Sequence, residues 1–143
     1  MSGVQEGLGT DGGNETARRM FEADQASKNL GMRLVAAGPG TATVEMAVGP
    51  LMVNGHGIAH GGFVFTLADT AFACACNRDG RGVTVASGAD ITFVAPVHEG
   101  DVLVATAVER TAYGRSSVVD VTVRRGEDVI AEFRGRSRTL NGG

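Results

Sequence analysis

Hydrophobic and polar positions divide the chain into segments with different periods. Apolar residues near helical spacing run from residue 15 to residue 30, with Asn14 placed to cap the start and Gly31 placed to end it. This pattern predicts a first helix over residues 15–30. Residues 1–13 contain five glycines and few large apolar side chains, so little apolar burial can offset the entropy of ordering them, which is typical of a mobile tail.

Strand-like segments fall into two groups. Residues 32–37 and 41–48 flank the turn Gly38-Pro39-Gly40 and predict a hairpin. The second group is separated by glycine-containing turns and consists of residues 83–94, 102–110, 116–125 and 129–138. Four strands in succession predict a meander.

A central helix is predicted between the two groups of strands. Residues 63–76 carry only three polar side chains, Thr66, Asp69 and Thr70. A helix that is apolar almost all round must be buried on nearly every side. We therefore expect this helix to form the middle of the core.

The order of elements predicts an α+β fold over residues 14–143, as a single domain without internal repeats. Short turns favour antiparallel pairing, because parallel neighbours need long crossovers. A single sheet can bury a long apolar helix only by curving around it, and such a sheet still exposes a face or an edge. We therefore expect the chain to form oligomers.

Composition narrows the function. Lys and Arg total 13 against 16 Asp and Glu, for a net charge of -3, so no basic surface is expected for a nucleic acid. The two cysteines, Cys74 and Cys76, lie one residue apart in an apolar run, which suits small core residues better than a disulfide or a zinc site. No apolar run approaches the roughly 18 residues of a membrane span, and no targeting segment is evident, so a cytoplasmic location is expected.

Asp69 is the exceptional residue of the central helix. An ionised carboxylate among apolar neighbours costs several kcal/mol unless it is paired, hydrogen-bonded or open to a water-filled cleft. It could be a buried acid bonded to a nearby hydroxyl or backbone group, or a functional carboxylate. The neighbouring motif favours the second interpretation.

The motif His60-Gly61-Gly62 lies at the expected start of the same helix. Free amides and the positive end of the helix dipole can hold an oxyanion there, although the glycines alone would also fit a tight turn. Asp69 follows Gly61 by eight residues, which places the two roughly 12 Å apart along a helix. One carbonyl cannot touch both, so we expect a site shared between the antiparallel central helices of two subunits in a two-fold dimer.

Other polar residues of the loop before the helix are weaker candidates. Asn54 could cap the loop, or it could orient a water molecule or the catalytic carboxylate, and the residues alone leave both interpretations open. His60 could donate a hydrogen bond to a substrate carbonyl oxygen, whereas His56 and His98 are typical loop residues. Two histidines are too few for zinc, and the glycine spacing does not fit a dinucleotide-binding turn, so no metal or cofactor is expected.

Several segments in order resemble the phenylacetic acid degradation thioesterases of the hotdog superfamily, from about Asn54 to the C-terminus. They are Asn54-Gly55-His56, His60-Gly61-Gly62, Phe65-Thr66-Leu67-Ala68-Asp69-Thr70-Ala71-Phe72-Ala73, Cys76-Asn77, Asp90-Ile91-Thr92-Phe93, Gly100-Asp101 and Phe133-Arg134-Gly135. The resemblance implies a hotdog fold, with a curved antiparallel sheet wrapped around the long central helix, and dimers commonly joined as tetramers. Ala95 departs from the pattern, because relatives often carry Arg before this proline, and the departure concerns nucleotide contacts.

The resemblance also implies roles for individual residues. Asp69 takes the place of the catalytic acid and Gly61 supplies the oxyanion-stabilising amide, with Asn54 and His60 completing the site. Gly62 lies beside that amide in the glycine pair and is expected to contact the substrate. Arg115 and Ser116, in a turn between two strands, resemble the segment that holds the CoA nucleotide, although an Arg in a hairpin turn is also a common solvated residue.

The expected function is hydrolysis of an aryl- or phenylacetyl-CoA thioester, including ring-hydroxylated phenylacetyl-CoA, with CoA as part of the substrate. Asp69 would either attack the carbonyl or activate water, and the sequence leaves both open. Two alternatives are a hotdog hydratase or dehydratase of acyl thioesters and a non-catalytic acyl-CoA sensor. The first lacks a His in the central helix, and the second lacks a nucleic-acid-binding segment.

Overall fold

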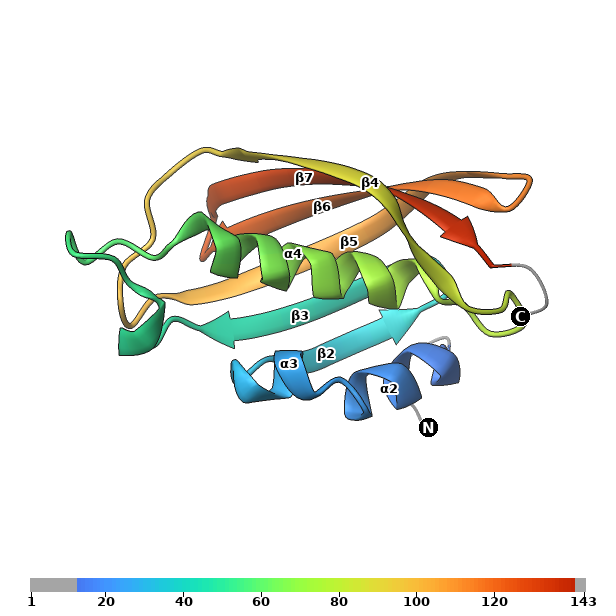
Figure 1. Cartoon of the computed structure of the whole chain (residues 1–143), viewed down its shortest axis with the longest axis horizontal. Helices are drawn as coiled ribbons and strands as arrows, with labels where there is room; N and C mark the ends of the chain where they lie inside the picture. Colours follow the sequence, from blue (N-terminus) through green and yellow to red (C-terminus); the bar gives the residue numbers. More distant parts are fainter. Residues whose placement is uncertain (1–12, 141–143) are drawn as a thin grey trace.

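The computed structural model describes residues 13–140, so the predicted tail over residues 1–13 lies outside the described residues except for Gly13. The fold is α+β, with six strands in one sheet and a long helix against it (Figure 1). The helices are α2 (Glu15–Glu22), α3 (Gln25–Asn29), the short 3-10 helix η1 (Pro50–Met52) and α4 (Gly61–Cys76). The strands are β2 (Arg33–Gly38), β3 (Thr41–Ala47), β4 (Thr84–Phe93), β5 (Val102–Tyr113), β6 (Ser116–Arg125) and β7 (Asp128–Thr139).

All neighbouring strands are antiparallel, as predicted, but the four C-terminal strands do not form a simple meander. The order across the sheet is β2-β3-β5-β6-β7-β4, so β4 pairs with β7 at the far edge instead of with β5. The expectation of a four-stranded meander was wrong because residues 94–101 are long enough for a crossover. Extended, they span roughly 26 Å, whereas three strand spacings amount to roughly 14 Å.

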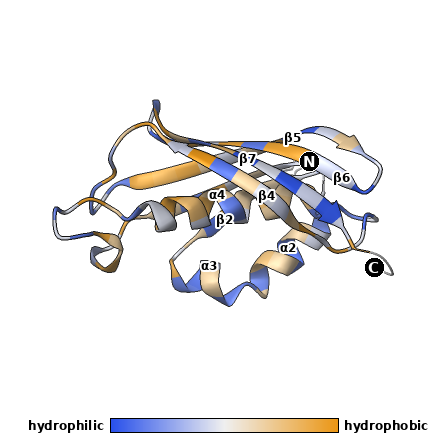
Figure 2. Cartoon of the chain, turned by 45° about the horizontal axis from the view of Figure 1, so that its top comes forward, coloured by the Kyte–Doolittle hydropathy of each residue, from blue (hydrophilic) through white to orange (hydrophobic). Residues whose placement is uncertain are grey.

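The central helix lies where the pattern predicted it, with its first turn extended to Gly61. It contacts every strand of the sheet, which curves around it. Figure 2 shows hydrophobic colour along much of α4 and hydrophilic colour on parts of α2 and α3. The expectation that α4 is enclosed on nearly every side holds only in part, because Gly62 is exposed and Thr66, Asp69 and Ala73 are partly exposed. We call these four residues, which follow one another at helical spacing, the open face of α4.

The N-terminal helical segment is two helices, so the prediction of one helix over residues 15–30 was wrong in its middle. Asn14 does cap α2, and Gly31 with φ +76° follows the end of α3. Between the helices, Asp24 adopts an extended conformation and its side chain accepts a hydrogen bond from the Ser27 amide. An Asp that caps a new helix satisfies free amides there, which stabilises the break.

Cys74 and Cys76 are buried free thiols, which confirms their prediction as core residues. Burial raises the pKa of each to about 12, so both stay protonated at neutral pH. None of the helices within residues 13–140 is long and apolar enough to cross a membrane.

Candidate active site

The three polar side chains of α4 have different surroundings. The Thr66 hydroxyl donates to the Gly62 carbonyl at 2.8 Å, within the same helix. The Thr70 hydroxyl is buried and lies 2.8 Å from the Ser27 hydroxyl of α3. The Asp69 carboxylate accepts no hydrogen bond and forms no ion pair with any residue in the described range 13–140. Two of the three polar groups are therefore satisfied inside the chain, and the only acid of the helix is not.

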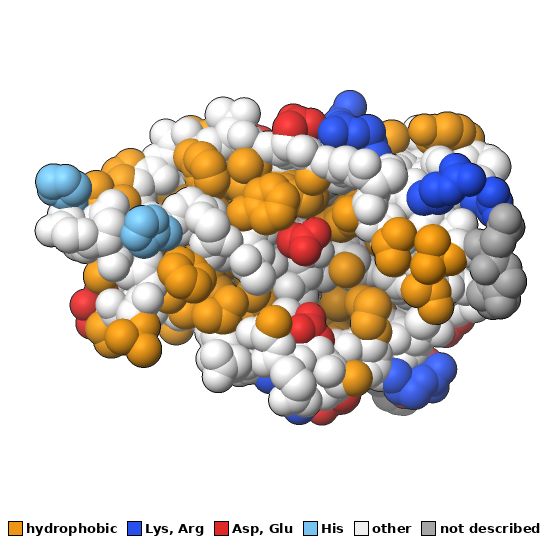
Figure 3. Space-filling model, viewed as in Figure 1, with side chains coloured by type: hydrophobic (Ala, Val, Ile, Leu, Met, Phe, Trp, Pro, Cys, Tyr) orange, Lys and Arg blue, Asp and Glu red, His pale blue; other side chains and the backbone are white. Residues whose placement is uncertain are grey.

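Asp69 is partly buried on the open face of α4. Burial, with a smaller contribution from the negative charge of Asp24, raises the pKa of its carboxyl above the ordinary value of 3.8. Figure 3 shows acidic side chains in the middle of this side of the molecule, surrounded by hydrophobic ones, with Lys and Arg toward the periphery. This carboxylate therefore has no partner among the described residues to balance its charge, and it is partly open to solvent.

The start of α4 presents two glycine amides. His60 is the N-cap residue, but its side chain makes no capping hydrogen bond and is exposed. Among described residues, nothing accepts a hydrogen bond from the amides of Gly61 and Gly62, as is normal in the first turn of a helix. These donors and the helix dipole form a place where a negative oxygen is stabilised.

Gly61 and Gly62 are glycines for different reasons. A Cβ on Gly61 would lie 2.7 Å from Cζ of Phe93, so the ring of Phe93 rests directly on the start of the helix. A Cβ on Gly62 would meet nothing within 4 Å. The sequence did not predict that Phe93 contacts Gly61. That contact depends on the crossover that brings the end of β4 to this helix.

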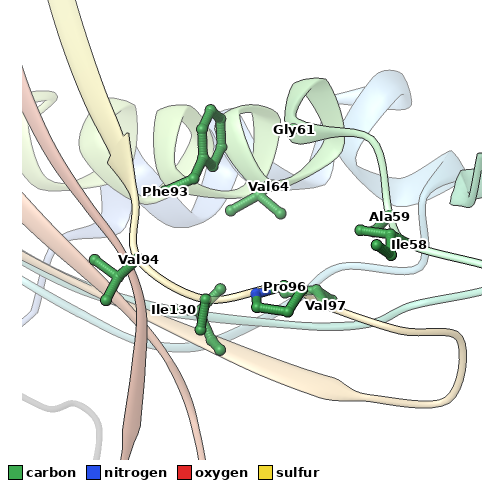
Figure 4. Close-up of a pocket in the computed structure, with 10 residues that line it drawn as sticks. Ile58, Ala59, Gly61, Val64, Phe93, Val94, Pro96, Val97 and Ile130 are labelled. Atoms are coloured by element: carbon green, nitrogen blue, oxygen red, sulfur yellow. The ribbon is translucent and has the colours of Figure 1, made fainter.

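An apolar pocket lies beside Gly61 (Figure 4). Its volume is about 360 Å³, and Ala95 lines it together with Phe93, Pro96 and Ile130. Figure 4 shows Val64 pointing from α4 toward the segment that carries Pro96. The residue that departs from the family pattern, Ala95, therefore adds to an apolar wall in this chain.

Asn54 caps the loop that leads to α4. Its Oδ1 accepts hydrogen bonds from the amides of His56, at 2.8 Å, and Ile58, at 3.1 Å. The loop is tied down further by hydrogen bonds from the Ala59 amide to the Val97 carbonyl and from the His60 amide to the Met52 carbonyl. The loop-capping interpretation of Asn54 is thus confirmed, and it leaves the Nδ2 group without a hydrogen bond to any described residue.

Arg115 lies in the turn between β5 and β6, Ser116 is the first residue of β6, and both are away from Gly61. They line a small pocket of about 110 Å³ together with Arg81, which follows the C-terminal end of α4. The whole length of α4 separates this pocket from the glycine amides. A single chain therefore does not bring Arg115 and Ser116 together with Gly61, and the rise of α4 likewise keeps Asp69 roughly 12 Å from Gly61.

Metal ligands are not gathered in the described part of the chain. Within residues 13–140, no three His, Cys, Asp or Glu side chains lie close enough together to hold a metal ion.

The sequence pattern did not reveal Asp24 as a residue whose charge acts on Asp69, because the pattern placed Asp24 inside a continuous helix. An Asp followed three residues later by Ser27 before more helix-forming residues was the available signal for an N-cap.

Comparison with known proteins gives consistent matches. The thioesterase superfamily model matches residues 56–132. The chain is 41% identical to the acyl-coenzyme A thioesterase PaaI of Escherichia coli K12, over 90% of this chain and 91% of that protein. It is 35% identical to human acyl-coenzyme A thioesterase 13, over 65% of this chain and 68% of that protein.

Solved structures agree with these matches. The structure of the Escherichia coli PaaI protein from the phenylacetic acid degradation operon superposes with a TM-score of 0.86 at 40% identity, covering 90% of this chain and 93% of that one. A mutant of the phenylacetic acid degradation protein PaaI from Thermus thermophilus superposes with a TM-score of 0.78 at 34% identity, covering 82% of this chain and 100% of that one.

Proposed function

The chain belongs to the thioesterase superfamily, and from this premise we propose that it hydrolyses an aryl- or phenylacetyl-CoA thioester to the free acid and CoA. The observation that carries the proposal is the carboxylate of Asp69, which is partly buried on α4 and has no partner among the described residues. The name of the Escherichia coli relative, an acyl-CoA thioesterase, and the operon from which its structure is described support the substrate class.

In the proposed site, Asp69 of one subunit faces the amide of Gly61 of the partner subunit. The thioester carbonyl oxygen accepts a hydrogen bond from that amide as negative charge develops on it. Asp69 acts either by taking a proton from the attacking water or by attacking the carbonyl to give an anhydride that water then opens. In both routes the bond from carbon to sulfur breaks, and the CoA thiolate leaves and takes up a proton.

The remaining residues have supporting roles in the proposal. Gly62 adds a second free amide beside the first and leaves room for the substrate. The free Nδ2 group of Asn54 and the exposed ring of His60 donate hydrogen bonds around the thioester. Arg115 and Ser116 hold the CoA nucleotide, because antiparallel pairing of two α4 helices would bring the C-terminal end of one beside the N-terminal end of the other.

The reaction is tested by following thiol release. The pure protein is incubated with phenylacetyl-CoA, ring-hydroxylated phenylacetyl-CoA, benzoyl-CoA and aliphatic acyl-CoA thioesters, and free CoA is measured with a thiol reagent. We expect the aryl substrates to be hydrolysed with the highest kcat/KM. Binding without thiol release would instead indicate a sensor, and a change at the β-carbon with the thioester intact would indicate a hydratase.

The shared site is tested by mixing inactive chains. If each site takes Asp69 from one subunit and Gly61 from the other, a mixed dimer of an Asp69→Asn chain and a Gly61→Pro chain contains one intact site. Gly61→Ala is the matched control, because it crowds Phe93 in the same way but keeps the amide. Absence of rescue in the mixture, with subunit exchange confirmed by mass, would exclude a site shared in this way.

The proposal also covers assembly and location. We propose a tetramer built from two such dimers, a reaction that needs no separate cofactor, and a cytoplasmic protein. Native mass spectrometry over a range of protein concentrations measures the assembly, and hydrolysis by protein dialysed against a chelator measures the need for a metal.

A further inference from the structure

Asp24 occupies the junction between α2 and α3, on the side of that segment that meets α4. As the N-cap of α3, it accepts hydrogen bonds from the amide of Ser27 at 3.0 Å and from the hydroxyl of Ser27 at 2.6 Å. Both carboxylate oxygens are therefore used, which fixes the orientation of the group.

Ser27 passes this constraint to α4. Its hydroxyl lies 2.8 Å from that of Thr70, and the two residues are only 1% and 7% exposed. The one hydrogen of the Ser27 hydroxyl is directed at Asp24, so the Thr70 hydroxyl must be the donor to Ser27. A chain of hydrogen bonds thus runs from the Thr70 hydroxyl through the Ser27 hydroxyl to the Asp24 carboxylate. Thr70 is the residue that follows Asp69 in α4.

The charges around Asp69 are few. Asp24 acts on it from the start of α3, and Asp69 in turn acts on the Cys76 thiol of its own helix. Asp24 also acts on Cys74 of α4, whereas Glu109 of β5 is paired with Arg78 and Arg81. No Lys or Arg within residues 13–140 forms an ion pair with Asp69 or Asp24 at the distances of the other salt bridges.

We propose that Asp24 is a positioning residue for thioester hydrolysis. The contacts with Ser27 and Thr70 hold its carboxylate in place, and its negative charge acts on Asp69 and strengthens Asp69 as base or nucleophile. The inference rests on the proposed role of Asp69. Its electrostatic support is that the negative charge of Asp24 adds to burial in raising the pKa of Asp69. A base is more effective when its pKa lies closer to the working pH.

The test is the pH dependence of kcat/KM for phenylacetyl-CoA in wild type and Asp24→Asn. Asn also caps helices and can accept from Ser27, so this change removes the charge while the junction is kept. We expect the acid limb of the profile to move to lower pH by roughly 0.5 units, because one neighbouring negative charge is lost. We also expect the plateau rate to fall a few-fold as the base becomes weaker. Asp24→Ser, another neutral N-cap, should reproduce the shift if Asp24→Asn folds poorly.

Asp79→Asn is the matched control. Asp79 anchors the other end of the same helical segment, accepting hydrogen bonds from the Thr16 amide at 2.8 Å and the Thr16 hydroxyl at 2.6 Å, but it does not act on Asp69. The acid limb of the kcat/KM profile of Asp79→Asn should coincide with that of wild type. An unchanged acid limb in both Asp24→Asn and Asp24→Ser, or an equal shift in Asp79→Asn, would overturn the role proposed for Asp24. Neither result would affect the role proposed for Asp69. Wild-type hydrolysis by Asp69→Asn would overturn the catalytic role of Asp69, on which this inference rests, whereas failure of the wild-type protein to release thiol would overturn the proposed function itself.

Discussion

The open face of α4 and strand β5 each hold an acid, and the two acids have opposite surroundings. Glu109, whose side chain is 5% exposed, lies 2.8 Å from a guanidinium nitrogen of Arg78 and 2.5 Å from one of Arg81. Asp69 has no such partner among described residues, and the charge that acts on it is the negative charge of Asp24.

The pKa values follow this difference. Burial raises the pKa of Glu109, but hydrogen bonds from Arg81, Arg78 and Ser117 outweigh it, so the net change is below the ordinary value of 4.5. Burial and Asp24 both raise the pKa of Asp69. Within residues 13–140, cations lie beside Glu109, which fastens a loop, and none forms an ion pair with Asp69 on the open face, which is the pattern expected of a reactive group.

The sharpest test of the contrast is Asp69→Asn. Loss of a catalytic carboxylate should lower kcat/KM for phenylacetyl-CoA by about 10²- to 10⁴-fold. Thermal unfolding should show a stability equal to or above that of wild type, because a partly buried charge without a partner is removed. Thiol release and circular dichroism melting measure the two effects. A large loss of both activity and stability would make Asp69 a structural residue.

Glu109→Gln should have the reverse effect. It leaves two guanidinium groups without their carboxylate, and we expect the free energy of unfolding to fall by about 2–4 kcal/mol, since breaking such a buried pair is costly. Urea unfolding measures the loss. The kcat of the folded fraction at a temperature well below the melting point should stay within about two-fold of wild type, because the residue does not act on Asp69. Inactivation without unfolding would place Glu109 in the site.

Packing beneath α4 and on its open face can be compared by adding one methyl group. A Cβ on Gly135 of β7 would lie 2.5 Å from Cδ1 of Phe72, a buried side chain of α4, so Gly135→Ala should destabilise the protein by about 1–3 kcal/mol. Gly62→Ala meets nothing within 4 Å and should leave stability within about 0.5 kcal/mol of wild type. Equal melting temperatures for the two variants would contradict the assignment of the two faces.

The smallest expected effect is on how the free energy of unfolding changes with pH. Because the pKa of Asp69 is raised above 3.8, the folded protein binds this proton more tightly, and this residue destabilises the fold once the pH is above its raised pKa. Asp69→Asn should therefore be more stable than wild type at neutral pH, and the advantage should shrink as the pH falls through that pKa. The pKa of Glu109 is lowered, so its stabilising effect is present above pH 4.5 and is lost as the pH falls through its folded pKa.

Urea titrations at a series of pH values separate the two signs. The difference between Glu109→Gln and wild type should be largest at neutral pH and decrease below pH 4.5. The differences for the two variants should thus have opposite signs at neutral pH. Parallel curves would mean that the two acids share one environment.

Much of this structure was predictable because it depends on local pattern. The hairpin, α4 and the later strands lie within three residues of the bounds that apolar periodicity predicted. The cap at Asn14 and the end at Gly31 followed from side-chain and backbone preferences that act within a few residues. The isolation of Asp69 was visible for the same reason, since a single acid in an apolar helix of residues 63–76 contrasts with its neighbours along the chain.

Contacts between distant segments were decided only in three dimensions. The pairing of β4 with β7, the ring of Phe93 on Gly61 and the placement of Asp24 near Asp69 join residues that are far apart in the chain. Local preferences carry no information about which of several sterically possible contacts a long connection will allow. The sequence by itself therefore determined the elements and singled out the candidate acid, whereas tertiary structure decided what surrounds that acid, because pKa, access and packing depend on distances through space.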